Sequence, residues 1–184
     1  MTRPETIIYD SPQSPPYPIK QNATIISGFG RGSSELGIPT ANIPITPELN
    51  NLECGIYYGW CKLKPNTSKN ETEEETVTGK HIIFNYGKFL NSNDLKVLPM
   101  VMSIGWNPFY KNRSKAAEVH IINEFNKCKL FYGCEIEFIL LGYVRPELNY
   151  TTKEALINDI NKDIEISKYI LEKPNYKKFK DELE

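Results

Sequence analysis

The chain has 184 residues, a length that favours a single domain spanning residues 1–184 with room for a sizeable core. Its 22 basic and 23 acidic residues leave a net charge of -1, so it lacks the basic footprint of a nucleic-acid-binding protein. No segment approaches the ~20 apolar residues of a membrane span, and the first residues lack the apolar stretch of a signal peptide. We expect an intracellular, most simply cytoplasmic protein, with mitochondrial association as an alternative.

The first twenty residues predict an extended arm, because five of them are proline, which fixes φ and removes a backbone donor. Such an arm either packs on the rest of the chain or stays unattached. The four cysteines form no Cys-x-x-Cys pair and have only two histidines to join them. This spacing favours reduced thiols over a metal site.

The middle of the chain alternates short apolar runs with glycine, proline and asparagine, a pattern typical of β-strands. The runs rich in β-branched and aromatic residues are 25–26, 56–60, 97–104, 117–122 and 130–144. Their spacing predicts an antiparallel barrel or sandwich rather than alternating strands and helices. Between them, the polar segment 65–78 with its run of three glutamates predicts a solvated surface loop.

One segment near the C-terminus has helical periodicity. Apolar residues recur at three- and four-residue spacing from Leu156 to Leu171, and Pro174 follows. Thr151 and Glu154 have the spacing of a capping box before this run. We therefore predict one amphipathic helix from about Thr152 to Leu171, with its apolar stripe on the outside or open end of the barrel.

The first chemical motif is the glycine-rich segment Gly28, Phe29, Gly30, Arg31, Gly32, Ser33. Alternating glycines let backbone N–H groups converge on an anion, and Arg31 adds a fork of donors suited to phosphate. The segment has neither the Gly-Lys-Ser/Thr of a P-loop nor the third glycine of a dinucleotide-binding fingerprint. A flexible turn explains it equally well.

A second motif, Pro-Thr-Ala-Asn, follows at residues 39–42. Thr40 and Asn42 share one face of an extended chain. A hydroxyl and an amide oxygen are hard ligands, suited to a Mg²⁺ ion that keeps water and phosphate oxygens as its other ligands. A structural turn built on the same two side chains is the alternative.

The third motif is the block from Ser103 to Ile122. On a strand Glu118 and His120 share one face, and a carboxylate among apolar neighbours can act as general base toward a hydroxyl. A surface carboxylate is the alternative for Glu118, as a packed imidazole is for His120. The basic residues Lys111, Arg113 and Lys115 either approach phosphate or form a solvated turn.

Taken together and in this order, these blocks resemble the riboflavin kinase (flavokinase) family. The residues that carry the resemblance are Gly28 to Asn42, Gly55 to Trp60, Ser103 to Ile122, and Phe131 to Leu171 with its Gly-Tyr-Val-Arg-Pro-Glu stretch at 142–147. They cover most of the chain. The proline-rich arm and an insertion at about 63–98 containing the acidic loop are similar to those of fungal members.

The resemblance implies a six-stranded antiparallel Greek-key β-barrel with a C-terminal α-helix. It implies transfer of the γ-phosphoryl group of Mg-ATP to the 5'-hydroxyl of riboflavin, giving FMN and ADP, with Zn²⁺ or Mn²⁺ as alternatives to Mg²⁺. Thr40 and Asn42 match the family's metal ligands, Gly28–Ser33 its phosphate-covering flap, and Glu118 its base. Lys111, Asn112 and Arg145 are expected near flavin or substrate. We expect a monomer that stops at FMN, since the adenylyltransferase domain of bifunctional relatives is missing.

Two other functions fit the same residues. A barrel that binds flavin or nucleotide without turnover would use the glycine-rich segment but would not need Glu118 as a base. A structural barrel that docks a partner through its aromatic residues would not need the pair Thr40 and Asn42.

Overall fold

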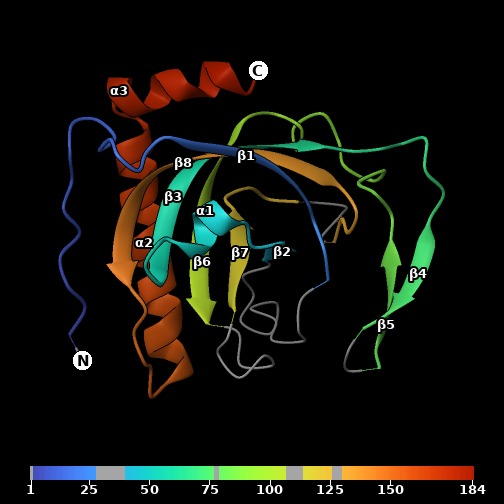
Figure 1. The fold of residues 1–184 in the computed structure, drawn as a ribbon, viewed down its shortest axis with the longest axis horizontal. Coiled ribbons are helices and arrows are strands. Elements are labelled where there is room, and N and C mark those ends of the chain that lie inside the picture. The colour runs from blue at the N-terminus through green and yellow to red at the C-terminus, as the bar shows by residue number, and fades with distance from the viewer. Residues whose placement is uncertain (1, 28–39, 77–78, 107–113, 126–129) are drawn as a thin grey trace.

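The computed structural model describes residues 2–27, 40–76, 79–106, 114–125 and 130–184 (Figure 1). Six strands form one sheet in the order β1-β8-β3-β6-β7-β2, with every neighbouring pair antiparallel. The strands of this sheet are β1 Ile19–Thr24, β2 Ala41–Ile43, β3 Gly55–Lys64, β6 Leu98–Trp106, β7 Lys115–Ile121 and β8 Glu135–Pro146. The sheet curls into a half-barrel, and just beyond β1 a backbone bridge from Ile26 to Asn42 joins its two edges. The predicted six-stranded antiparallel fold with a C-terminal helix is confirmed.

Side-chain alternation along the strands separates two hydrophobic cores. On β3, Tyr57 and Cys61 point into the curled sheet, where they meet apolar residues from all six strands. Tyr58 and Trp60 point the other way, against the C-terminal helices. The indole Nε1 of Trp60 donates to the carbonyl of Tyr176 at 3.1 Å, so the outer core is also tied by a buried hydrogen bond. Both faces of β3 are therefore buried, which explains its continuous apolar sequence.

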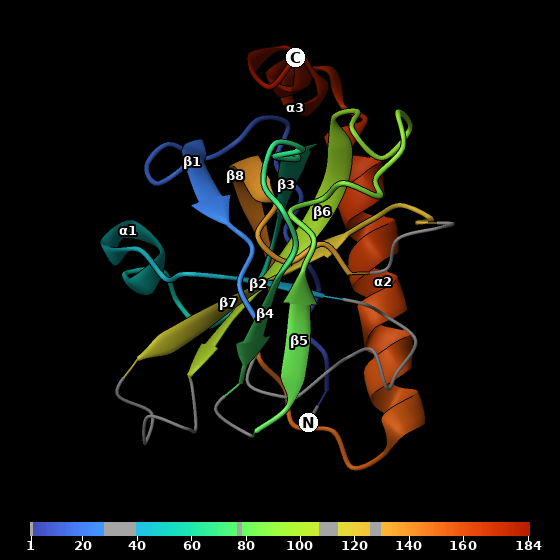
Figure 2. The same ribbon diagram turned by 90° about the vertical axis from the view of Figure 1, so that its right-hand side faces the viewer.

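The predicted helix is present as α2, Lys153–Leu171, and lies on the outside of the sheet (Figure 2). Thr152, rather than Thr151, is its N-cap, and its hydroxyl accepts the N–H of Ala155 at 3.1 Å. The helix ends before the short helix α3, Pro174–Lys177, and the 3-10 helix η3, Lys178–Glu182. No helix of the described segments is both long and apolar enough to cross a membrane.

The acidic segment differs from the expected loop. Its glutamates are exposed as predicted, but they lie in strand β4, Thr72–Glu75, which pairs with β5, His81–Phe84, as a separate two-stranded sheet. His81 Nδ1 lies 3.3 Å from Glu73, and Lys88 Nζ lies 2.9 Å from Glu71. Backbone pairing with a strand that lies in the same insertion thus orders a run of residues whose composition indicates a loop.

The N-terminal arm packs against the body of the protein, beside β8 and α2 (Figure 1). Strand β1 pairs with β8 only as far as Leu140, so it leaves the edge of residues 141–146 uncovered. The hydroxyl of Thr6 donates to the carbonyl of Val144 on that edge at 2.9 Å. Further along the arm, the backbone carbonyls of Tyr9 and Asp10 accept from side chains of α3. The arm therefore covers a strand edge that would otherwise invite pairing with another chain.

One carboxylate, that of Glu137, links three strands and should make the stability of the fold depend on pH. Glu137 of β8 is paired with Lys64 of β3 and with Lys20 of β1. The hydrogen bond from Lys64 and the charges of both lysines outweigh burial and lower the pKa of Glu137. Because the folded pKa lies below the ordinary value of 4.5, the carboxylate stabilises the fold above pH 4.5, and this stabilisation is lost as the pH falls through the folded pKa.

The Tm is therefore expected to fall as the pH drops below 4.5, and Glu137→Gln should flatten that fall. Thermal unfolding followed by circular dichroism across this range measures the effect. Glu74→Gln, at an exposed position of β4, is the matched control, and its Tm should fall with pH as that of the wild type does. If the Tm of Glu137→Gln fell below pH 4.5 as steeply as that of the wild type, the pairing of Glu137 with the two lysines would contribute nothing to stability.

Candidate active site

Two of the predicted site residues are direct cross-strand partners. Asn42 of β2 lies opposite Glu118 of β7 in the antiparallel register. Their neighbours Ala41, Ala117 and Val119 point into the inner core, so alternation places the side chains of Asn42 and Glu118 together on the outer face. Directly opposed residues of such a pair have Cβ atoms about 4.5–5.5 Å apart. The amide and the carboxylate are thus brought together by residues 76 positions apart in the sequence.

The same register continues across the sheet as a row of side chains on its outer face. Glu118 pairs with Ser103 of β6, Ser103 with Ile56 of β3, and Ile56 with Arg145 of β8. We call these five residues, beginning with Asn42, the cross-strand row. With neighbouring strands about 4.8 Å apart, the row extends about 14 Å from Glu118 to Arg145. It changes along its length from polar side chains to an apolar one and then to a buried cation.

Several predicted site residues lie outside the described part of the chain. These are Gly28, Phe29, Gly30, Arg31, Gly32 and Ser33 of the glycine-rich segment, together with Lys111 and Asn112. Thr40, the other predicted metal ligand, is half-buried and lies immediately before β2, two residues from Asn42. The assignment of roles to all of these residues stays a prediction.

Lys115, one of the three basic residues upstream of Glu118, has a structural role. Its ammonium donates to the carbonyls of Asn50, the last residue of the short helix α1 (Pro47–Asn50), and of Leu52 just beyond it, at 2.9 and 2.6 Å. It also lies 5.2 Å from the ring centre of Trp106. A cation at the carbonyl end of a helix is favourably placed. The interaction joins the start of β7 to α1 and so supports the strand that carries Glu118.

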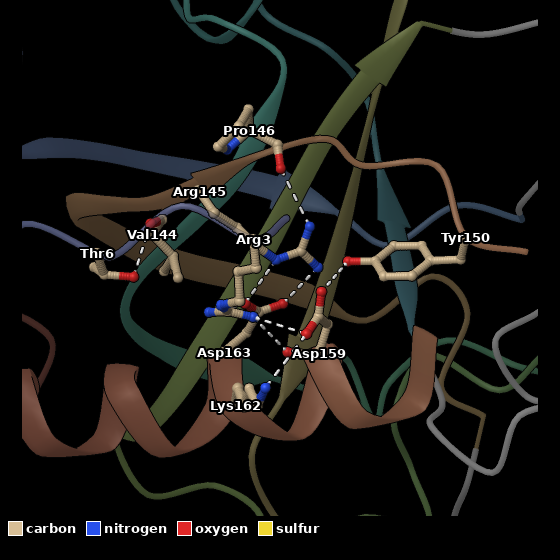
Figure 3. A network of polar contacts seen from close by, with 9 residues as sticks. All are labelled: Arg3, Thr6, Val144, Arg145, Pro146, Tyr150, Asp159, Lys162 and Asp163. Carbon is tan, nitrogen blue, oxygen red and sulfur yellow. Dashed lines mark hydrogen bonds and ion pairs between the residues drawn. The ribbon is translucent and has the colours of Figure 1, made fainter. Parts of the chain in front are cut away.

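Arg145 lies in a buried polar network between β8 and α2 (Figure 3). Its Nε and Nη2 donate to the two carboxylate oxygens of Asp163, both at 2.8 Å, and its Nη1 donates to the carbonyl of Pro146 at 3.2 Å. The side chains of Arg145 and Asp163 are each only 3% exposed. Burial alone would lower the pKa of Arg145, but the hydrogen bond and charge of Asp163 outweigh it and raise the pKa. The guanidinium is therefore charged and held in one orientation.

Asp159, Asp163 and Arg3 belong to this network and were not predicted from the sequence. Both aspartates are buried within the packed face of α2, where the periodicity predicts apolar residues. Carboxylates spaced four apart along an otherwise apolar helix face are the signal that could have revealed them, because a buried charge requires a partner. Their partners come from β8 and from the N-terminal arm, both distant in the sequence.

Glu147 is a second carboxylate near the row that the sequence did not single out. A Cβ on Gly105 would lie 2.1 Å from Glu147 Oε1, so the missing side chain of this glycine makes room for the carboxylate. Burial raises the pKa of Glu147, and the charge of Arg145 opposes that shift. Gly105 is two residues from Ser103 on the same strand face, so Glu147 lies on the same side of the sheet as Glu118.

The described residues contain no cluster of three or more histidine, cysteine, aspartate or glutamate side chains able to hold a metal ion. Cys54 and Cys61 are free cysteines. Thr40 and Asn42, the metal ligands predicted from the sequence, are oxygen donors, and a phosphate substrate would supply others. Those two residues fit Mg²⁺, which is usually held by few protein oxygens and by substrate phosphates.

Comparison with known proteins identifies the family. Residues 15–171 match the flavokinase model, described as riboflavin kinase. A riboflavin kinase of Lodderomyces elongisporus is 63% identical over 185 residues, covering 100% of both chains. That of Saccharomyces cerevisiae is 47% identical over 175 residues, covering 92% of this chain and 79% of the other.

Among solved structures, riboflavin kinase from Trypanosoma brucei is similar in fold, with a TM-score of 0.60 at 20% identity. The match covers 89% of this chain and 85% of that one. The curled six-stranded sheet and its outer helix are thus shared with a protein of low sequence identity. The chain belongs to the riboflavin kinase family.

Proposed function

We propose that this chain transfers the γ-phosphoryl group of ATP to the 5'-hydroxyl of riboflavin, with the reaction centred where β2 pairs with β7. Its family membership supports the substrates. The observation that carries the assignment of the site is the direct pairing of Asn42 with Glu118 on one face of the sheet. That pairing brings a donor suited to a metal–phosphate complex within about 5 Å of a group suited to act as a base.

In this proposal Glu118 accepts the proton of the attacking hydroxyl as the new P–O bond forms. The bond between the γ-phosphorus and its bridging oxygen breaks, and ADP leaves. Thr40 and Asn42 would hold Mg²⁺, which neutralises charge on the phosphate oxygens when bound. Phosphoryl transfer requires mainly positioning and charge neutralisation from the protein. The glycine-rich segment 28–33 is proposed to cover the phosphates through its backbone N–H groups and Arg31.

The cross-strand row suggests where each substrate lies. The attacking and leaving oxygens must be roughly in line, so the phosphate donor and the acceptor lie on opposite sides of the transferred group. With the phosphates at Asn42 and the base at Glu118, the body of the acceptor would extend toward Ser103, Ile56 and Arg145. Arg145 lies at that end of the row, but its side chain is almost completely buried and three of its five N–H donors are committed to Asp163 and Pro146, so a contact with the acceptor would have to use the remaining two.

A binding module would bind the same two molecules without converting them. Glu118 favours the enzyme, because a module that only binds has no need of a carboxylate placed to act as a base opposite the proposed metal ligand. The identity of the metal, the monomeric state and the cellular location are proposals carried over from the sequence. FMN formation by the purified chain, measured by chromatography with and without divalent metal, separates the enzyme from the binding module.

Asn42→Ala is expected to raise the Mg²⁺ concentration needed for half-maximal FMN formation by at least about tenfold, since losing even an outer partner of a metal typically costs about 10–100-fold in affinity. Direct binding of Mn²⁺ in the presence of ATP, followed by paramagnetic resonance, gives a readout that does not depend on turnover. Asn22→Ala, at an exposed position of β1, is the matched control and should match the wild type. Equal metal requirements in all three proteins would remove Asn42 from the metal site.

A further inference from the structure

The N-terminal arm places a second arginine in the buried network of Arg145. Arg3 Nη2 lies 2.8 Å from Asp163 Oδ1, the same oxygen that accepts from Arg145 Nε. Arg3 Nη1 donates to the backbone carbonyl of Asp159 at 3.0 Å and lies 3.7 Å from its carboxylate. Figure 3 shows the two guanidinium groups on either side of these carboxylates. The side chain of Arg3 is only 14% exposed, so this side chain is inserted into the protein.

The charges of this network balance only when Arg3 is present. Two arginines face two aspartates, and the tyrosine hydroxyl of Tyr150 donates to Asp159 Oδ2 at 2.7 Å. Lys162 lies 4.0 Å from Asp159, but its side chain is 61% exposed and solvent screens its charge. Without Arg3, the two carboxylates would share the single buried cation Arg145. An unbalanced buried charge is costly, so the carboxylates would be expected to turn toward water or to admit it.

Both ends of the segment from Arg145 to Tyr150 depend on these two carboxylates. Asp163 holds Arg145 at the end of β8, and Asp159 holds the hydroxyl of Tyr150 before α2 begins. The guanidinium carbon of Arg145 also lies 5.8 Å from the ring centre of Tyr150. Within the segment, Glu147 lies against Gly105, two residues from Ser103 on β6. The segment therefore borders the cross-strand row on the side to which the proposed acceptor extends.

We propose that Arg3 is a positioning residue that fixes the segment 145–150 through Asp159 and Asp163 and so shapes the acceptor side of the site. The N-terminal arm then serves as a part of the active-site support as well as a cover for the edge of β8. This inference rests on the proposed function only in identifying riboflavin as the substrate on that side. Loss of Arg3 should weaken the binding of riboflavin. The binding of ATP, which is proposed to lie at the other end of the row, should be unchanged.

The test compares Arg3→Met with the wild type by steady-state kinetics and by direct riboflavin binding, followed through quenching of flavin fluorescence. We expect kcat/KM for riboflavin to fall about tenfold, within the roughly 10²-fold that a small misplacement can cost. The Kd for riboflavin should rise, and the KM for ATP should stay unchanged. Arg3→Lys keeps a cation that can reach the carboxylates and should recover part of the riboflavin affinity. It also serves as the milder variant in case Arg3→Met folds poorly.

Asn175→Ala is the matched control for the arm. It removes a different anchor, the hydrogen bond from Asn175 Nδ2 to the carbonyl of Asp10 at 3.2 Å, without touching the network. Wild-type riboflavin affinity in this control, with a loss in Arg3→Met, supports the proposal. Unchanged riboflavin affinity in folded Arg3→Met, or equal losses for riboflavin and ATP, would overturn it. A wild-type chain that binds riboflavin but makes no FMN would refute the proposed function alone, because the binding comparison would still decide the role of Arg3.

Discussion

Glu118→Gln is expected to lower kcat for FMN formation by about 10²–10⁴-fold, the usual contribution of a positioned general base. The amide keeps the size and the hydrogen-bonding reach of the carboxylate but cannot accept the hydroxyl proton. Because the substitution lies opposite Asn42 on a strand whose core-facing neighbours are unchanged, the fold should be retained. Steady-state kinetics with separate binding measurements for riboflavin and ATP check whether the loss is in kcat.

The control for this prediction is Glu74→Gln, the same change at an exposed position of β4. It should keep the wild-type kcat. A Glu118→Gln variant with near-normal kcat would show that the hydroxyl loses its proton without this carboxylate. A variant that loses binding of both substrates and keeps its fold would instead place Glu118 in substrate binding.

Asp163→Ala is expected to destabilise the protein by about 3–5 kcal/mol, because removing one partner of a buried ion pair leaves the other charge without compensation. In the wild type Arg145 and Asp163 are almost completely buried, and their hydrogen bonds are bidentate. For a protein of this size the loss corresponds to a fall in Tm of roughly 6–20 °C. Thermal and urea unfolding measure it.

Glu165→Ala, on an exposed face of the same helix, tests whether the loss is specific to the network and should change stability by less than about 0.5 kcal/mol. The double variant Asp163→Leu with Arg145→Met removes both charges and should be far more stable than Asp163→Ala, because replacing a whole buried pair is often neutral. If the double variant were as unstable as the single one, uncompensated charge would not be the cause.

The elements with local signals were predictable from the sequence. Helix α2 follows from its three- and four-residue periodicity, and its start was missed by one residue because Thr151 and Thr152 both suit an N-cap. Strands β3 and β8 follow from their β-branched and aromatic runs. Strand β4 does not, since its glutamates are stabilised by pairing with β5 and not by their own propensity.

The candidate site was predictable in its residue types and not in its arrangement. The chemistry of Asn42 and Glu118 and the family resemblance predict both as site residues, but their pairing depends on strand register, which is set by contacts between distant segments. The network around Arg145 could not be predicted from the sequence either, because Arg3 and Asp163 lie 160 residues apart. Sequence patterns report which side chains share a face, and only the fold shows which faces meet.

The most direct test of the proposed site is the rate of the phosphoryl-transfer step itself. Wild-type protein and Glu118→Gln, each saturated with riboflavin and present in excess over labelled ATP, would be mixed with Mg²⁺ and quenched at short times. The proposal predicts that the wild type converts the label to FMN in a single turnover and that Glu118→Gln does so at least about 100-fold more slowly. Equal single-turnover rates in the two proteins, or labelled phosphate released to water in place of FMN, would contradict it.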